Sequence, residues 1–222
     1  MRLACLFSGG KDSAYAAFAL CSQGHEIALL SVRSESDSMM FHHPNAIWRD
    51  AQAKCMGLAH REISAKNENE LDVLEKELSE MRIGGKQIDG VVSGAIASDY
   101  QKERIDAICE RLRIRSFAPL WHTGERTLYE MVSNCEIYVV SVAAENLDEK
   151  WLGRRLDEKA IEEIKKIRPQ VNPFFEGGEG ETFVADAPFF SKRIAISGWE
   201  KTWDGVRGVA EIKKAKLVEK KF

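Results

Sequence analysis

Six consecutive residues near the start of the chain have the types and spacing to bind a chain of phosphates: Ser8, Gly9, Gly10, Lys11, Asp12 and Ser13. Two adjacent glycines permit positive φ angles and let several backbone N–H groups approach a ligand. The serine hydroxyls and the lysine ammonium add donors, and a helix starting here would point its positive end at the same place. This phosphate loop therefore predicts a cradle for a polyphosphate, and a glycine turn capped by a serine is the structural alternative.

Two common phosphate-binding patterns do not fit the phosphate loop. A Walker A loop requires a glycine five residues before the Gly-Lys pair and a Ser or Thr after the lysine, but Cys5 and Asp12 stand at these positions. The Rossmann pattern fails because no third glycine follows at the required spacing. The loop instead resembles the S-G-G-x-D-S loop of the N-type ATP pyrophosphatases, which cleave ATP between its α and β phosphates.

A second unusual run places three carboxylates, Glu176, Glu179 and Glu181, on a backbone that is rich in glycine. Clustered negative charges repel each other in a folded loop unless a cation or a donor-rich ligand lies near. This acidic segment, Glu176–Glu181, therefore predicts either an acidic surface loop or a site for Mg²⁺, ammonium or a cationic substrate. In the second case a carboxylate could accept the proton of attacking ammonium, and Glu179 is our candidate.

Two weaker candidates follow from residue type alone. An exposed pair such as Trp151 and Arg154 can stack, or can hold a phosphate or a carboxylate. Composition alone favours the other interpretation, an aromatic residue at a helix start beside solvated arginines. His42 and His43 fall in a loop and are unremarkable without further support.

The elements that must position the phosphate loop are a strand before it and a helix after it. Apolar residues run from Leu3 to Phe7, and Ala14–Leu20 is again mostly apolar. Strands and helices then alternate, which predicts a parallel sheet with right-handed crossovers. The further strands are expected near residues 27–32, 90–93 and 114–118, and the helices near 13–23, 45–57, 67–81 and 98–112, with capping boxes at Asn67/Glu70 and Ser98/Gln101.

The pattern changes after Trp121. Helices are expected near residues 127–132 and 157–167, and strands near 137–142, 182–185, 193–197 and 209–212. We therefore expect two domains. A nucleotide-binding α/β domain would span residues 1–120, with helices on both faces of a Rossmann-like parallel sheet, and a smaller α+β substrate domain would span residues 121–222.

Composition narrows the function further. A net charge of −3 argues against a broad nucleic-acid surface, and no apolar run approaches the roughly 18 residues that span a bilayer. Because the sequence begins with a core strand, we expect no signal peptide and a cytoplasmic location. No cysteines form a C-x-x-C pair, which predicts reduced, mostly buried thiols at Cys5, Cys21, Cys55, Cys109 and Cys135.

Taken in order, motifs along nearly the whole chain resemble those of the diphthine–ammonia ligases within the N-type ATP pyrophosphatases. Besides the phosphate loop, the resemblance rests on Met40-Phe41-His42 in the loop 34–42, Gly94–Ser98 with Tyr100, Gln101 and Arg104, Pro119-Leu120-Trp121, Trp151-Leu152-Gly153-Arg154, Glu176–Thr182 and Asp186-Ala187-Pro188. Two positions depart from the family pattern. Phe175 stands where the family usually has a glycine, and Gly180 where it has an aromatic residue, which predicts a differently shaped loop on the substrate side.

The resemblance implies an adenine nucleotide alpha hydrolase-like fold and the last step of diphthamide synthesis. ATP would adenylate the carboxylate of diphthine on translation elongation factor 2, and ammonia would then displace AMP. The implied cofactors are ATP and Mg²⁺, with Asp12 as the metal ligand and with Lys11, Asp12 and Glu179 as catalytic residues. The implied cofactor-binding residues are Ser8–Ser13, Ser34 and Gly94. The implied substrate residues are His42, Tyr100, Gln101, Arg104, Trp151, Arg154, Glu176, Glu179 and Glu181.

Two other functions stay open at this point. One is another adenylating enzyme of the superfamily that modifies tRNA, although the missing C-x-x-C pairs and the negative net charge weigh against it. The other is a sensing module that binds ATP without turnover. Because no glutaminase segment precedes the phosphate loop, we expect free ammonia as the nitrogen source. We expect no membrane partner and no direct nucleic-acid partner, and a homodimer is compatible with the sequence.

Overall fold

The structure is a computed structural model that describes residues 1–34, 44–66, 69–167 and 171–220. The chain divides into two compact units. The first unit contains Met1–Ser8, Asp12–His43 and Leu58–His122, and the second contains Gly9–Lys11, Pro44–Gly57 and Thr123–Phe222. Within the phosphate loop, Gly9–Lys11 therefore belong to the second unit, and Ser8, Asp12 and Ser13 belong to the first.

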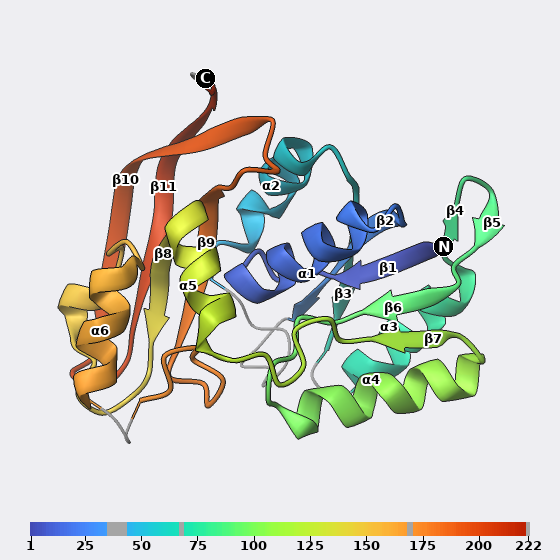
Figure 1. Cartoon of the computed structure of the whole chain (residues 1–222), viewed down its shortest axis with the longest axis horizontal. Helices are drawn as coiled ribbons and strands as arrows, with labels where there is room; N and C mark the ends of the chain where they lie inside the picture. The colour runs from blue at the N-terminus through green and yellow to red at the C-terminus, as the bar shows by residue number, and fades with distance from the viewer. Residues whose placement is uncertain (35–43, 67–68, 168–170, 221–222) are drawn as a thin grey trace. The chain divides into compact units, whose positions relative to one another are not determined.

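A parallel sheet with the strand order β3-β2-β1-β6-β7 forms the centre of the first unit (Figure 1). Its central strands β1 and β2 are almost entirely buried, which explains their continuous apolar sequence. The strands are β1 (Arg2–Leu6), β2 (Glu26–Ser34), β3 (Ala59–Ala65), β6 (Gly90–Val92) and β7 (Arg115–Phe117).

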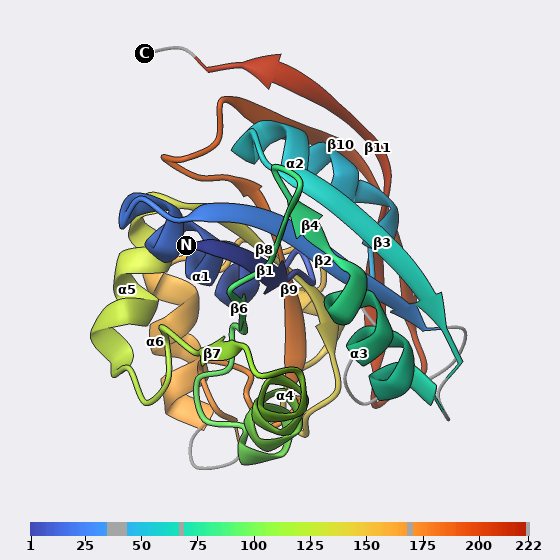
Figure 2. The same ribbon diagram turned by 90° about the vertical axis from the view of Figure 1, so that its right-hand side faces the viewer.

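Three helices, α1 (Lys11–Ser22), α3 (Glu70–Glu80) and α4 (Asp99–Leu112), accompany this sheet. The step from β1 through α1 to β2 and the step from β6 through α4 to β7 run in opposite directions across the sheet. Right-handed crossovers then place α1 and α4 on opposite faces. Helices α3 and α4 lie side by side (Figure 2), and their side chains share one buried cluster with Leu30 and Val91. The predicted parallel sheet with helices on both faces is confirmed.

Some of the predicted elements need correction. Strand β3 was missed because it lies at a sheet edge and is mostly polar and partly exposed, so no apolar run marks it. A short hairpin, which the sequence did not predict, follows α3 and consists of β4 (Arg82–Ile83) and β5 (Lys86–Gln87), with Gly84 and Gly85 between them. The helix predicted at 45–57 is a 3₁₀ turn, η1 (Ala46–Trp48), followed by α2 (Arg49–Met56).

The two expected capping boxes differ in outcome. The Ser98 hydroxyl accepts a hydrogen bond from the Gln101 N–H, so this cap forms at the start of α4. Helix α3 begins at Glu70 with Asn69 as its N-cap residue and without a side-chain cap bond, and Asn67 lies outside the described residues. The Ser98/Gln101 cap is therefore confirmed, whereas the Asn67/Glu70 box stays a prediction.

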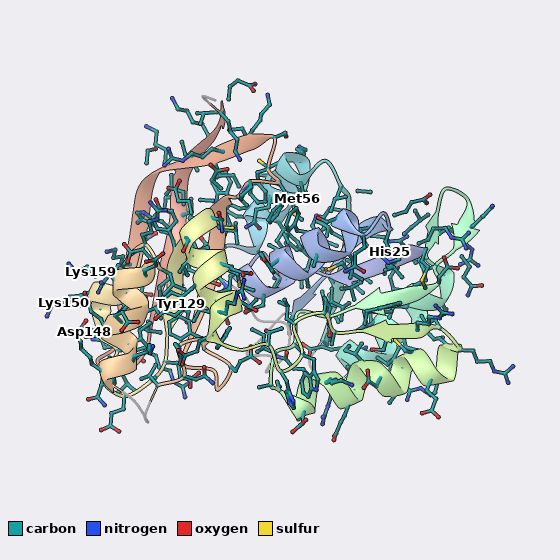
Figure 3. All side chains as sticks on the ribbon, in the orientation of Figure 1. His25, Met56, Tyr129, Asp148, Lys150 and Lys159 are labelled. Atoms are coloured by element: carbon teal, nitrogen blue, oxygen red, sulfur yellow. The ribbon has the colours of Figure 1, made fainter. Side chains whose placement is uncertain are left out.

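The second unit contains an antiparallel sheet with the order β10-β11-β8-β9. Its helices α5 and α6 lie side by side, and Tyr129 of α5, labelled in Figure 3, donates its hydroxyl to Glu162 of α6. This confirms a C-terminal part with an antiparallel sheet and helices, but the expectation that it is the smaller part was wrong, because the second unit also takes in Gly9–Lys11 and Pro44–Gly57. Its elements are α5 (Glu125–Asn134), β8 (Glu136–Val142), η3 (Glu149–Trp151), α6 (Glu158–Ile167), β9 (Gly180–Asp186), β10 (Lys192–Trp203) and β11 (Gly208–Glu219), together with α2.

The cysteines are free thiols, as expected, and all except Cys21 are buried. Burial raises the pKa of Cys109 and of Cys135 to about 11, so both thiols stay protonated near neutral pH. Across the described ranges, no helix is both long enough and apolar enough to cross a membrane.

Candidate functional site

The phosphate loop follows β1 at the carboxyl edge of the parallel sheet. The Ser8 N–H donates to Ser13 Oγ at 3.2 Å, and the two serine hydroxyls lie 3.0 Å apart. Gly9 has a φ of 87°, which favours glycine strongly over other residues. The loop thus closes on itself directly at the N-terminus of α1, where backbone N–H groups and the helix dipole favour an anion.

Gly94 follows β6, the strand beside β1, and packs against the start of α1. A Cβ on Gly94 would lie 2.8 Å from the Ser13 nitrogen and 2.9 Å from the Asp12 carbonyl carbon. Strands β1 and β6 are the pair at which the chain reverses its direction across the sheet, and open α/β sheets bind ligands at such a point. The structure therefore brings Gly94, Asp12 and Ser13 together at the predicted edge.

The turn of the loop, Gly9–Lys11, makes its described contacts inside the second unit. Lys11 is 3% exposed, and its ammonium donates to the backbone carbonyl of Phe174 at 2.7 Å. Its backbone N–H donates to Thr182 Oγ1 at 3.1 Å. We expected Lys11 to add a point charge for a phosphate chain, whereas its described bonds connect the turn to the residues on either side of the acidic segment.

Sequence patterns missed two contacts of this turn. Thr182 was noted only as the end of a motif, and Gln52 only as part of a predicted helix. Gln52 Nε2 donates to the carbonyls of Gly9 and Val184. No local signal could have found Gln52, because its partners are 43 and 132 residues away in the sequence.

The acidic segment is shaped by one of its own carboxylates. Glu179 accepts hydrogen bonds from the N–H groups of Asn172 at 3.0 Å and Gly177 at 2.7 Å. These two donors offset the repulsion expected among the glutamates. The Glu179 carboxylate is therefore held at a fixed place, and Glu176 and Glu181 flank it in the sequence.

The two departures from the family pattern are physically linked. Phe175 has a φ of 63°, a conformation that favours glycine, and its side chain is nevertheless buried. A Cβ on Gly180 would lie 2.6 Å from the Ser141 carbonyl oxygen and 3.4 Å from the Phe175 ring. The Phe175 ring thus packs against the place where Gly180 carries no side chain, so the two unusual residues compensate each other.

Replacing Phe175 with alanine and with glycine tests this arrangement. We expect Phe175→Ala to lower the free energy of unfolding by about 3 kcal/mol, because the buried ring is lost while the backbone strain is unchanged. Phe175→Gly loses the same ring but relieves the strain, so we expect it to be more stable than Phe175→Ala by about 1 kcal/mol. Urea unfolding measures both values, and equal stability of the two variants would contradict the strain.

Residues of α4 expected to contact the substrate gather in the first unit. The Arg104 guanidinium lies over the Tyr100 ring at 3.4 Å and donates to the Tyr100 carbonyl. The Lys102 ammonium lies 5.5 Å from the centre of the Trp121 ring, and the His122 N–H donates to the Ile96 carbonyl. These contacts bring the segment Pro119–His122 next to the segment Gly94–Arg104.

Trp151 and Arg154 match neither of the two sequence interpretations fully, because they stack but the ring is buried. Trp151 is 7% exposed, and the Arg154 guanidinium stacks on its ring at 4.4 Å. Arg154 also donates to Glu163 at 2.6 Å, which raises the pKa of Arg154 and lowers that of Glu163. The interpretation that composition favoured, with solvated arginines, was therefore wrong for Arg154, and the burial of Trp151 follows from the pairing of this segment with β8 through Val139.

Of the remaining expected site residues, Ser34 lies at the sheet edge and His42 lies outside the residues that the structure describes. Ser34 is the last residue of β2, at the same carboxyl edge as the phosphate loop. In the described ranges no group of three or more His, Cys, Asp or Glu side chains could hold a metal ion by itself. A Mg²⁺ ion on Asp12 would thus depend on ligand oxygens, which fits its preference for phosphates and few protein ligands.

Comparison with known proteins assigns the N-terminal and the C-terminal part of the chain to the same protein family. The family model described as "Diphthamide synthase N-terminal domain" matches residues 1–116, and "Diphthamide synthase C-terminal domain" matches residues 123–218. The chain is 36% identical to the proteins named diphthine–ammonia ligase of Bos taurus and of Homo sapiens, over 90% of this chain and 84% of each relative. It is 31% identical to the protein of that name from Schizosaccharomyces pombe, over 90% of this chain and 37% of that protein.

Among solved structures, the chain is similar to a predicted subunit of tRNA methyltransferase from Methanocaldococcus jannaschii. The TM-score is 0.50 at 20% sequence identity, over 85% of this chain and 98% of that one. At this identity the likeness supports the fold alone.

Proposed function

The chain belongs to the diphthamide synthase family of diphthine–ammonia ligases, and on that premise we propose how its residues perform ATP-dependent amidation. The reaction turns the carboxyl group of diphthine into an amide. The observation that carries the proposal is the phosphate loop closed at the N-terminus of α1, with Gly94 packed against it at the edge of the parallel sheet. We infer that the carrier of diphthine is translation elongation factor 2.

The chemistry requires activation because a carboxylate is a poor acyl donor. One carboxylate oxygen of diphthine attacks the α-phosphorus of ATP, and pyrophosphate leaves. Ammonia then attacks the acyl carbon, AMP departs with the oxygen, and the nitrogen loses a proton. The backbone N–H groups and hydroxyls of Ser8–Ser13 stabilise the charge on the departing pyrophosphate, while Ser34 and Gly94 border the nucleotide.

The loop residues fit a Mg²⁺ ion bound jointly with the nucleotide. Asp12 lies in the first turn of α1 and offers a carboxylate oxygen, the ligand type that Mg²⁺ prefers. Once bound, the ion would neutralise charge on the phosphates. Lys11 supports the same loop from the second unit through its bond to Phe174.

The acidic segment suits the two cationic groups of this reaction. We assign Glu176 and Glu181 to the trimethylammonium group of diphthine, which their carboxylates would attract. Glu179, oriented by two backbone N–H groups, accepts the proton that the attacking nitrogen loses. In the first unit, Tyr100, Gln101, Arg104 and His42 are assigned to contacts with the protein substrate. In the second unit, Arg154 is assigned to such a contact, and the buried Trp151 supports it from below by stacking.

Mass spectrometry of diphthine-bearing elongation factor 2 tests the function. Incubation with the protein, ATP and ammonium should convert the acid to the amide and release AMP and pyrophosphate in equal amounts. Omitting ATP or ammonium should each prevent conversion. Release of ADP would refute the adenylate, and ATP binding without any conversion would favour a nucleotide sensor instead.

A further inference from the structure

We propose that Gln52 and Thr182 are positioning residues that fasten the turn Gly9–Lys11 to strand β9. This fastening holds the turn Gly9–Lys11 and the acidic segment in one fixed relation during the reaction. The inference deepens the proposed function and rests on it only in that the loop binds ATP. Every residue that carries it lies in the second unit.

Gln52 is fully buried in α2, and its amide is shared between two segments. Nε2 donates to the Gly9 carbonyl at 2.8 Å and to the Val184 carbonyl at 2.9 Å. Both partners can only accept, so the nitrogen and not the oxygen must face them. One side chain thereby joins the turn of the phosphate loop to the middle of β9.

The oxygen of the Gln52 amide shows that burying this side chain costs free energy. Its Oε1 is buried, and the described residues provide it with no hydrogen-bond partner. It also lies against the turn, because a Cβ on Gly9 would come within 2.5 Å of it. A buried polar atom without a partner is unfavourable. An apolar residue would avoid that cost, so the two carbonyl contacts explain why an amide stands here.

Thr182 makes the matching contact on β9 itself. Its Oγ1 accepts the Lys11 N–H at 3.1 Å, and two residues further on the Val184 N–H donates to the Gly9 carbonyl at 3.2 Å. Strand β9 is an edge strand of the antiparallel sheet. Its outer backbone groups would otherwise be exposed, and here they pair with the turn.

The turn consequently touches both flanks of the acidic segment. Lys11 donates through its ammonium to Phe174, two residues before the segment, and through its N–H to Thr182, directly after it. A turn that shifts when a triphosphate binds must move both flanks. Gln52 and Thr182 therefore set the position of the segment expected to bind the cationic substrate relative to the phosphates.

Thr182 allows a sharp test with matched variants. Thr182→Val keeps the shape of the side chain and removes the hydroxyl, whereas Thr182→Ser keeps the hydroxyl. Thr202→Val makes the same change at an exposed position of β10. Calorimetry with α,β-methylene-ATP and Mg²⁺ measures nucleotide binding in the full chain without elongation factor 2.

We expect Thr182→Val to weaken nucleotide binding about tenfold, the effect of losing roughly one hydrogen bond. Thr182→Ser and Thr202→Val should stay within about twofold of the natural protein, since neither loses that bond. Wild-type affinity for Thr182→Val, or equal losses for the valine and serine variants, would overturn the role of Thr182.

Gln52→Met tests the role of Gln52, and it also tests whether nucleotide binding at the turn is coupled to the acidic segment. Hydrogen exchange should show that the nucleotide analogue protects the amides of residues 177–181 in the natural protein. In folded Gln52→Met and in Thr182→Val this protection should be lost, while Gln87→Met, at an exposed position of β5, should keep it. Unchanged protection in both variants would overturn the coupling, and Thr182→Val decides alone if Gln52→Met does not fold.

The test of the positioning role can fail or succeed independently of the test of amidation. Nucleotide binding and exchange do not require diphthine. If the natural protein fails to amidate elongation factor 2 while these variants behave as expected, the substrate assignment falls and the positioning role stands. If amidation proceeds and Thr182→Val binds nucleotide normally, the positioning role falls.

Discussion

Replacing Asp12 with asparagine lowers the rate of ATP-dependent amidation by a factor on the order of 10³ while the chain stays folded. Asp12 is the only carboxylate of the phosphate loop and lies in the first turn of α1. The amide keeps the shape of the side chain but offers no negative charge to a Mg²⁺ ion that accompanies the phosphates. ATP–pyrophosphate exchange and mass spectrometry of the amidated substrate both measure the loss.

The control for this prediction is Asp72→Asn. Asp72 also lies in the first turn of a helix, α3, and is exposed. In both variants an acidic side chain near a helix N-terminus is lost, which costs about 0.3–1 kcal/mol of stability. We therefore expect similar small decreases in melting temperature but loss of activity only for Asp12→Asn. Exchange at the wild-type rate in Asp12→Asn would remove Asp12 from the mechanism.

Replacing Gly94 with alanine should lower kcat/KM for ATP by about 100-fold, because the new methyl group displaces the start of α1. The Cβ would lie 2.8, 2.9 and 3.0 Å from Ser13 N, Asp12 C and Ser13 Cα. All three are backbone atoms at the helix N-terminus, so no side-chain rotation relieves the contact. The shift would move the N–H groups and the Asp12 carboxylate away from the phosphates.

Gly124→Ala provides the matched change. Gly124 has a φ of −79°, and nothing lies within 4 Å of a Cβ built on it, so this variant should keep full activity. Steady-state kinetics at varied ATP and urea unfolding together separate misplacement of the loop from loss of folding. A folded Gly94→Ala variant with the wild-type kcat/KM for ATP would show that β6 does not position the loop.

The sequence predicted some strands of the parallel sheet and missed another. The buried strands β1 and β2 were predicted because an apolar run reports burial on both faces. The edge strand β3 has no such run, since its neighbours cover it on one side only. Its polar sequence, Ala59–Ala65, therefore carries little local information about strand formation.

The candidate site shows the same difference among individual side chains. For Trp151 and Arg154, residue type left stacking and solvated arginines both open, because burial depends on how the segment packs on β8. Glu179 was recognised as one of three clustered carboxylates. Its two backbone donors, Asn172 and Gly177, became evident only once the loop had a shape.

The sequence by itself determined the phosphate loop, the alternation of strands and helices around it and the order of the motifs. These features are local: glycine conformation, helix dipoles and apolar periodicity act over a few residues. Only the tertiary structure decided that Lys11 reaches Phe174 and Thr182, and that Gln52 joins Gly9 to β9. Such bonds connect residues far apart in the chain. Their partners are set by how a turn, a helix and an edge strand satisfy one another's buried polar groups, and no spacing in the sequence records this.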